Sequence, residues 1–178
     1  SLAILVALAA RTAQAQTTTD LAAMPTDGLE QIGASAAIAD RADAVVVNPA
    51  GLGFARGLSL RYLHQEGSRS GVADESNGDG LYVGARLLGP LSAGFAVEWL
   101  RHRPAIGDLR RTTWALALGG DAISVGANVH LFSADRPALE DVVSVDLGAM
   151  TRPARWLSIG LAVRDVDAPR LGGGDLPR

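Results

Sequence analysis

The 178-residue sequence contains no cysteine and no lysine: apart from three histidines, every basic residue is arginine. The absence of cysteine excludes disulfide frameworks, thiolate zinc sites and thiol nucleophiles. The absence of lysine excludes a serine–lysine pair, and no Gly-x-Ser-x-Gly turn is present for a serine nucleophile. Aromatic residues make up only 4% of the chain, and the net charge of −3 offers no basic surface to nucleic acid. We therefore expect no catalytic residue, no cofactor, no metal site and no nucleic-acid partner in this chain.

The chain starts with a continuous apolar run, SLAILVALAA, at 1–10. A membrane-spanning helix needs about 20 apolar residues, so this run is too short and has instead the length of a signal-peptide core. Ala13-Gln14-Ala15 supplies the small-x-small pattern of a cleavage site. We predict a signal peptide over 1–15, cleaved after Ala15, with its charged start preceding Ser1. The alternative is a short buried helix of the folded domain.

From Gly57 onward, apolar residues alternate with small or polar ones in a two-residue period, which is the pattern of half-buried strands. The pattern occurs in seven segments, at 58–62, 81–87, 91–99, 112–118, 123–131, 143–149 and 157–163. The 21 glycines suit closely packed β-structure better than a helical bundle. We expect an all-β fold, an antiparallel up-and-down meander of seven strands that forms part of an outer-membrane-type β-barrel. A soluble periplasmic β-sandwich is the alternative.

The connections between these segments differ in length in a regular way. Short turns alternate with long polar connections, the short ones at 89–90, 119–122 and 152–155 and the long ones at 67–79, 101–109 and 134–141. Outer-membrane barrels show this sorting, with tight periplasmic turns and longer external loops. Because seven strands would leave open edges, we expect further strands after Arg178. A sparse aromatic girdle is expected at the external rim from Tyr82, Trp99, Trp114 and Phe132, and at the periplasmic rim from Trp156.

The small or polar face of each strand is expected to line the lumen of such a barrel. The polar residues expected to face a solute in the lumen are Arg61, Arg86, Glu98, His130 and Arg164. Their mixed charge predicts no clear selectivity for a solute. The one catalytic arrangement left to consider is a carboxylate pair of Glu98 and Asp146. An oxygen-rich stretch at 74–80 lacks the glycine and glutamate positions of a calcium loop, so we expect a solvated external loop there.

Residues 16–56 form a separate N-terminal segment between the signal peptide and the first strand. Ser35 to Asp43 is expected to form one or two helical turns, with Ser35 as N-cap. Val45-Val46-Val47 is expected to be a short β-type run that Asn48-Pro49 stops. The glycines at 51–57 resemble a dinucleotide-binding turn only superficially, because an alternating strand follows them and not a helix.

Residues 42–53, ADAVVVNPAGLG, resemble a signature of the fatty-acid-transporter-like and PorV-like outer-membrane proteins. The signature residues are Asn48, Pro49, Ala50, Gly51, Leu52 and Gly53. The resemblance implies a barrel of the Gram-negative outer membrane whose N-terminal segment is tucked into or beneath the lumen. We expect three regions: a signal peptide at 1–15, a plug-like segment at 16–56 and an incomplete barrel at 57–178. Outer-membrane lipid is the expected partner, and an apolar small molecule or a secretion system is left open as a further one.

A narrower resemblance rests on several phrases together: NPAGLGF at 48–54, RYLHQE at 61–66, GDGLY at 78–82, VEWLR at 97–101 and DLGAMTRP at 146–153. These are similar to the barrel-like N-terminal region that precedes the peptidase domain in some proteins of the signal peptide peptidase A family. That family uses a serine–lysine pair, so the resemblance implies a peptidase beyond Arg178. Three functions are therefore open: a non-catalytic outer-membrane barrel for passage, anchoring or assembly; the front part of such a peptidase; or a soluble periplasmic binding module.

Overall fold

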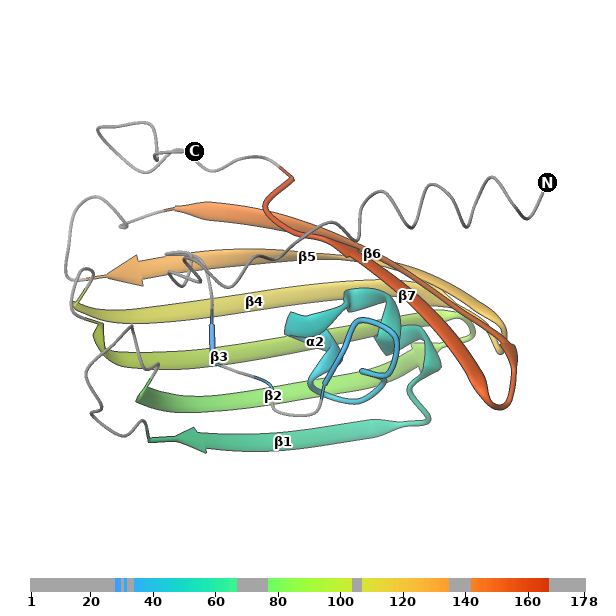
Figure 1. Cartoon of the computed structure of the whole chain (residues 1–178), viewed down its shortest axis with the longest axis horizontal. Helices are drawn as coiled ribbons and strands as arrows, with labels where there is room; N and C mark the ends of the chain where they lie inside the picture. The colour runs from blue at the N-terminus through green and yellow to red at the C-terminus, as the bar shows by residue number, and fades with distance from the viewer. Residues whose placement is uncertain are drawn as a thin grey trace, which may run out of the picture.

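Seven strands form one antiparallel sheet in the computed structural model, which describes residues 28–29, 31, 34–66, 77–103, 107–134 and 142–166. The strands are β1 (Leu58–Gln65), β2 (Asn77–Leu88), β3 (Leu91–Arg103), β4 (Gly107–Gly119), β5 (Ile123–Ala134), β6 (Val143–Ala154) and β7 (Leu157–Val163). They pair in sequence order, which makes β1 and β7 the two edges of the sheet in the described part of the chain. The sheet curls into a half-barrel (Figure 1). The predicted all-β meander is confirmed, whereas the predicted signal peptide at 1–15 lies outside the described residues.

The two faces of the sheet differ in polarity, as the two-residue period predicts. Most side chains of the concave face are small or polar, and Glu98 and Thr113 there are completely buried, whereas Leu100, Leu109 and Phe132 form an apolar cluster near one end of it. On the convex face they are apolar and exposed, and all seven strands contribute, among them Leu60, Leu81, Trp99, Leu116, Leu131, Leu147 and Leu161. The apolar surface of the sheet therefore faces outward and the polar surface faces inward.

Two short helices of the N-terminal segment lie in the concavity of the sheet (Figure 1). They are α2 (Ala44–Val47) and the 3-10 helix η1 (Pro49–Phe54). Every residue of α2 is buried, and so is every residue of η1 except Phe54. Helix α2 packs against β2, β3 and β4, while η1 contacts chiefly β4, β5 and β6. Among the described residues, no helix is both long and apolar enough to cross a membrane.

The expectation of a β-type run at Val45-Val46-Val47 is wrong, because these residues are helical. The concave face of a sheet presents side chains and not backbone hydrogen-bonding groups, so a strand placed there would leave its N–H and C=O groups unpaired. A helix satisfies such groups internally, and the N–H of Asn48 bonds to the carbonyl of Ala44 at 3.1 Å. Burial in the concavity therefore outweighs the β-propensity of valine.

The helical turns expected at 35–43 are reduced to short turns. The carbonyl of Ser35 accepts the N–H groups of Ile38 and Ala39, at 3.1 and 3.0 Å, which closes one turn. The chain turns again just before α2, and no helix forms over 35–43. The segment therefore folds back on itself within the width of the sheet.

The connections match the predicted lengths at one end of the sheet only. Tight turns are confirmed at 89–90 and at 120–122, and the third lies at 155–156, later than the expected 152–155, because β6 continues to Ala154. At the opposite end, the long loop expected at 101–109 is wrong, because β3 runs to Arg103 and pairs there with Gly107 at the start of β4. Similarly, Asn77 and the residues after it belong to β2 and not to a loop. Polar residues thus continue the strands beyond the apolar part of the sheet.

Two residues expected at the external rim, Tyr82 and Phe132, are buried on the concave face instead, with 0% and 3% of their surface exposed. Trp99, Trp114 and Trp156 are exposed. The two-residue alternation already assigns Tyr82 to the inward face. The direction of its side chain therefore follows from its place in the strand and not from its aromatic character.

Candidate functional site

The N-terminal segment touches the sheet where the strands carry glycine. A Cβ atom added to Gly126 would lie 2.6 Å from the carbonyl carbon of Pro49. One added to Gly148 would lie 2.0 Å from Oδ1 of Asn48, and one added to Gly94 would lie 2.4 Å from a methyl carbon of α2. Contacts this short are not tolerated in close-packed interiors, so a residue with a side chain would push the segment away. We name Gly94, Gly126 and Gly148 the glycine seat.

Asn48, the first residue of the signature, is completely buried and binds in several directions. Its Oδ1 accepts the N–H of Ala50 at 3.1 Å, which caps the start of η1. Its Nδ2 donates to the carbonyl of Ala36 at 2.7 Å. The same Nδ2 lies 3.4 Å from the carbonyl oxygens of Ala149 on β6 and Leu161 on β7. The side chain of Asn48 therefore connects the preceding turn, η1 and two strands of the sheet.

Asn128 on β5 is a second buried amide and supports α2 from the wall. Its Nδ2 donates to the carbonyl of Val45 at 2.8 Å. Its Oδ1 accepts the N–H of Asp146 at 3.2 Å. A buried amide with both its donor and its acceptor in use fixes the position of the groups it binds. The backbone of the segment is thus held by wall side chains as well as by packing.

Three polar side chains beside Asn128 form a line across β4, β5 and β6. Nδ1 of His130 lies 2.8 Å from Oγ1 of Thr113, and its Nε2 lies 2.8 Å from a carboxylate oxygen of Asp146. Asp146 also accepts the N–H of Asp165 at 2.9 Å. A hydroxyl, an imidazole and a carboxylate in a row suggest nucleophilic catalysis, but Thr113 is completely buried and offers no hydroxyl to a substrate. We assign this row a structural role.

A second charged network lies nearer the opposite end of the strands, around the completely buried Glu98. Its carboxylate accepts the hydroxyl of Tyr82 at 2.8 Å and the backbone N–H of Leu29 at 3.1 Å. The guanidinium of Arg111 bonds to it through two nitrogen atoms. Gln31 in turn donates to the Tyr82 hydroxyl at 2.8 Å. This network fixes the early part of the N-terminal segment to β2, β3 and β4.

Two of the arginines expected in the lumen connect the wall to the segment. Arg61 forms an ion pair with Asp43 at 3.4 Å, directly before α2. Arg86 points its Nη2 at two carbonyl oxygens, that of Gly119 at 3.3 Å and that of Gly53 at 3.5 Å. Both contacts hold the ends of the buried segment against the sheet.

The carboxylate pair considered from the sequence is not formed. Glu98 binds Arg111 and Asp146 binds His130, in two separate networks. Arg164, the last of the five expected lumenal residues, follows the end of β7 and is exposed, although its charge acts on Asp146. Within the described ranges, no group of three or more His, Cys, Asp or Glu side chains is placed to hold a metal ion.

Sequence reasoning missed Arg111 and Thr113, the partners of Glu98 and His130. Both occupy alternate positions of β4 whose side chains point to the concave face, so the two-residue period could have identified that face. Their pairing depends on register, in which Arg111 lies opposite Glu98 and Thr113 lies opposite His130. Register between strands separated by loops of uncertain length cannot be read from one sequence.

Comparisons with protein-family models, with curated proteins and with solved structures gave no match. The resemblances of the 42–53 signature and of the signal peptide peptidase A phrases therefore stay predictions. The function has to be argued from the geometry of the sheet and of the segment within it.

Filling the glycine seat is expected to weaken the fold. Gly126→Ala places a methyl group against the backbone of Pro49, and we expect a loss of about 1–3 kcal/mol in the free energy of unfolding. Gly120→Ala is the matched control, because a Cβ there meets no atom within 4 Å. Urea unfolding of the protein and of both variants measures the difference. Equal stability of the two variants would show that the segment does not rest on β5.

Breaking the buried ion pair is expected to cost more. Glu98→Gln leaves the Arg111 guanidinium buried without its counter-charge, and loss of one partner of such a pair costs about 3–5 kcal/mol. Adding Arg111→Gln should recover part of the loss, because no unpaired charge is then buried. The same unfolding measurement tests this, with Arg110→Gln as a control for loss of an arginine, because Arg110 is exposed on the convex face of β4. A double variant no more stable than Glu98→Gln would contradict the prediction.

Proposed function

We propose that this chain forms part of the wall of an outer-membrane β-barrel, with its convex face in lipid and its concave face around a plug-like segment. The observation that carries the proposal is the inverted polarity of the sheet. Leu116 and Leu118 on the convex face are 58% and 56% exposed, whereas Glu98 and Ser144 on the concave face are completely buried. A soluble sandwich would bury the apolar face against a second sheet, and large exposed apolar patches are rare on soluble monomers.

The height of the apolar surface suits a bilayer. On β3 the convex apolar positions run from Leu91 to Trp99, which is about 27 Å along a strand at ~3.4 Å per residue. With a strand tilt of about 40°, this corresponds to roughly 20 Å across the membrane, close to the apolar band of about 25 Å in outer-membrane barrels. We name this surface the apolar band.

Polar side chains end the apolar band on the side of the longer connections. Asp79 lies there on the convex face, where it accepts the hydroxyl of Tyr62 at 2.6 Å and a guanidinium N–H of Arg101 at 2.6 Å. His64 lies 2.8 Å from the same carboxylate. The hydrogen bonds from Tyr62 and His64, together with the charge of Arg101, hold the pKa of the Asp79 carboxyl below its usual range. An ionised cluster beyond the band is what the polar headgroup region accommodates.

The edges of the sheet also bear on this proposal. Inside a bilayer, unpaired backbone groups cost several kcal/mol each, so β1 and β7 require partner strands. The barrel in the membrane is therefore completed by strands in addition to β1–β7. We place this barrel in the outer membrane of a Gram-negative cell envelope, which is where barrels of this type occur.

The filled concavity favours anchoring or assembly over passage of a solute. Helices α2 and η1 occupy the centre of the concave face and are buried against β4. Buried side chains from several strands hold them, with Asn48 and Asn128 binding their backbone directly. A solute could pass along this part of the wall only if the segment left the concavity and gave up these bonds. We therefore propose a non-catalytic wall with a fixed internal segment.

A charge placed in the apolar band tests the proposal. Leu116→Arg lies near the middle of the band, where arginine costs about 2–4 kcal/mol in a membrane barrel. We expect less folded protein in the outer-membrane fraction and loss of heat-modifiable migration on denaturing gels. Ser133→Arg is the control, since Ser133 is exposed on the convex face of β5 beyond the band, where it pairs with Arg110.

The opposite result would identify a soluble protein. In that case the parent would be recovered from the soluble periplasmic fraction without detergent. Leu116→Arg would then be at least as soluble as the parent, because it replaces an apolar side chain that water already reaches. This outcome would support the sandwich alternative and exclude the barrel.

A further inference from the structure

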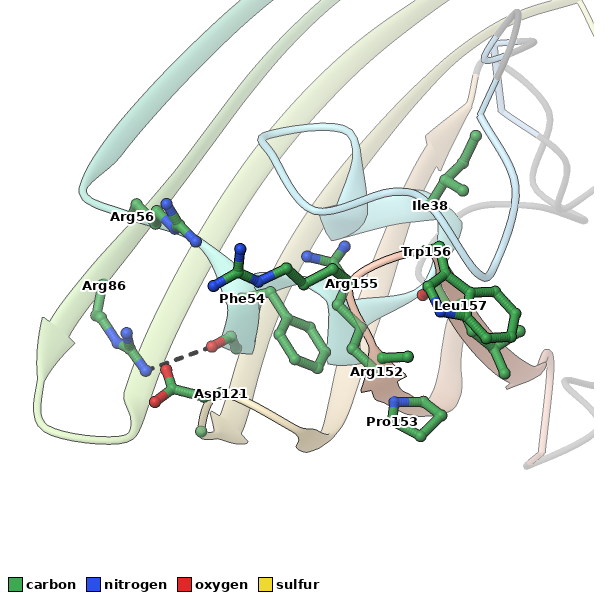
Figure 2. Close-up of a pocket in the computed structure, with 14 residues that line it drawn as sticks. Ile38, Phe54, Arg56, Arg86, Asp121, Arg152, Pro153, Arg155, Trp156 and Leu157 are labelled. Atoms are coloured by element: carbon green, nitrogen blue, oxygen red, sulfur yellow. Dashed lines mark hydrogen bonds between the residues drawn. The ribbon is translucent and has the colours of Figure 1, made fainter.

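A pocket of about 880 Å³ opens on the concave side of the sheet, at the end that carries the tight turns (Figure 2). It lies between the last residues of η1 and the turn at 155–156. Its charged lining consists of four arginines and one acid, namely Arg56, Arg86, Arg152, Arg155 and Asp121. Its apolar lining is formed by Ile38, Phe54, Trp156 and Leu157. Positive charge and an apolar wall therefore meet in one cavity.

One of the four arginines is occupied by its neighbours. Arg152 forms an ion pair with Asp40 at 2.9 Å and lies over the Phe54 ring, 4.4 Å from its centre. Arg152 is therefore already charge-paired, although its side chain stays 29% exposed. It also holds Phe54 in place as the apolar wall.

The other three arginines face the cavity with binding capacity to spare. Arg86 uses Nη2 on two carbonyl oxygens, while its Nε is buried and has no hydrogen-bond partner in the described part of the chain. A buried, unsatisfied donor costs free energy that a bound acceptor would recover. Arg56 and Arg155 are exposed at the opening, and Figure 2 shows Arg155 directed across it toward the side that carries Arg56 and Arg86. Asp121 alone offsets these three charges within the lining.

We propose that this pocket binds a phosphomonoester carried on an apolar or aromatic body. A carboxylate is satisfied by one guanidinium, whereas the three terminal oxygens of a phosphomonoester can each accept from a different arginine. The apolar wall formed by Phe54 and Trp156 suits the organic part of such a molecule, and the volume is in the range of small-molecule sites.

The ligand would also join parts of the chain that are far apart in sequence. Arg56 follows η1, Arg86 belongs to β2 and Arg155 lies in the turn between β6 and β7. A phosphate bound by all three connects the buried segment to both sides of the curled sheet. Because such a ligand binds the folded state alone, it should stabilise the fold as its concentration rises. The inference goes beyond the wall function and does not depend on lipid contact.

Isothermal titration calorimetry of the full-length, detergent-folded protein with phenyl phosphate tests the site. We expect saturable binding of one molecule per chain, with benzoate at least tenfold weaker. Arg86→Gln and Arg155→Gln should each weaken binding at least tenfold. Arg110→Gln is the matched control, because Arg110 is an exposed arginine on the convex face of β4. The affinity of this variant for phenyl phosphate should equal that of the parent protein. Arg155→Gln keeps the test decisive if Arg86→Gln disturbs folding, since Arg155 is exposed in a turn.

Competition then identifies the source of the phosphate. Displacement of phenyl phosphate by phosphatidic acid in mixed micelles would point to a lipid headgroup, and displacement by glucose 6-phosphate would point to a soluble ester. Either result supports the site. The inference is overturned by absence of saturable binding to the parent protein, by equal affinity for benzoate, by displacement with neither competitor, or by a loss of affinity in Arg110→Gln as large as in Arg155→Gln.

Discussion

The N-terminal segment can lie against the sheet because the strands carry glycine at the points of closest approach. Gly126 and Gly148 pair with each other across β5 and β6, and Gly94 pairs with Gly84 across β3 and β2. These positions bring the backbone of η1 within reach of the wall, where short amide side chains can bind it. With larger residues in the seat, α2 and η1 would stand away from the sheet and their peptide groups would lose those partners. The rest of the concave face is organised around this approach.

The polarity of the strands follows from the same constraint. A buried segment with irregular backbone has N–H and C=O groups that its own helices do not satisfy, so the wall beside it must supply donors and acceptors. Asn128 does this for α2, and Glu98 does it for the backbone of Leu29. Most inward positions beside α2 and η1 are therefore small or polar, and most apolar residues of the strands lie at outward positions. The inverted polarity that supports a lipid-facing wall and the presence of the internal segment are two consequences of one arrangement.

The sequence predicts the strands well because a two-residue period states directly which side chains share a face. It also places Glu98 and His130 inward, as the structure has them. It fails where the environment decides the conformation. Val45-Val46-Val47 has β-propensity, but no strand edge is available in the concavity, and the run becomes helical. The prediction fails again at 101–109. The polar residues there were expected to form a loop, but they continue β3 and begin β4. The partners Arg111 and Thr113 depend on strand register, which composition and spacing do not contain.

The segment is held at both ends as well as in the middle, and this determines how it can move. Near the end of the sheet with the longer connections, the Glu98 network binds Leu29, and at the tight-turn end Arg86 reaches the carbonyl of Gly53. Between them, Asn48 bonds to the turn, to η1 and toward two strands. Local fraying of one end leaves the other contacts intact, so no partial opening clears the concavity. Release of the segment would have to break all three groups of contacts together. Leaving one partner of a buried charge pair without the other is among the largest free-energy costs in a protein interior. A wall built in this way holds its internal segment as a fixed part of the structure, and a ligand at the tight-turn end would strengthen that hold.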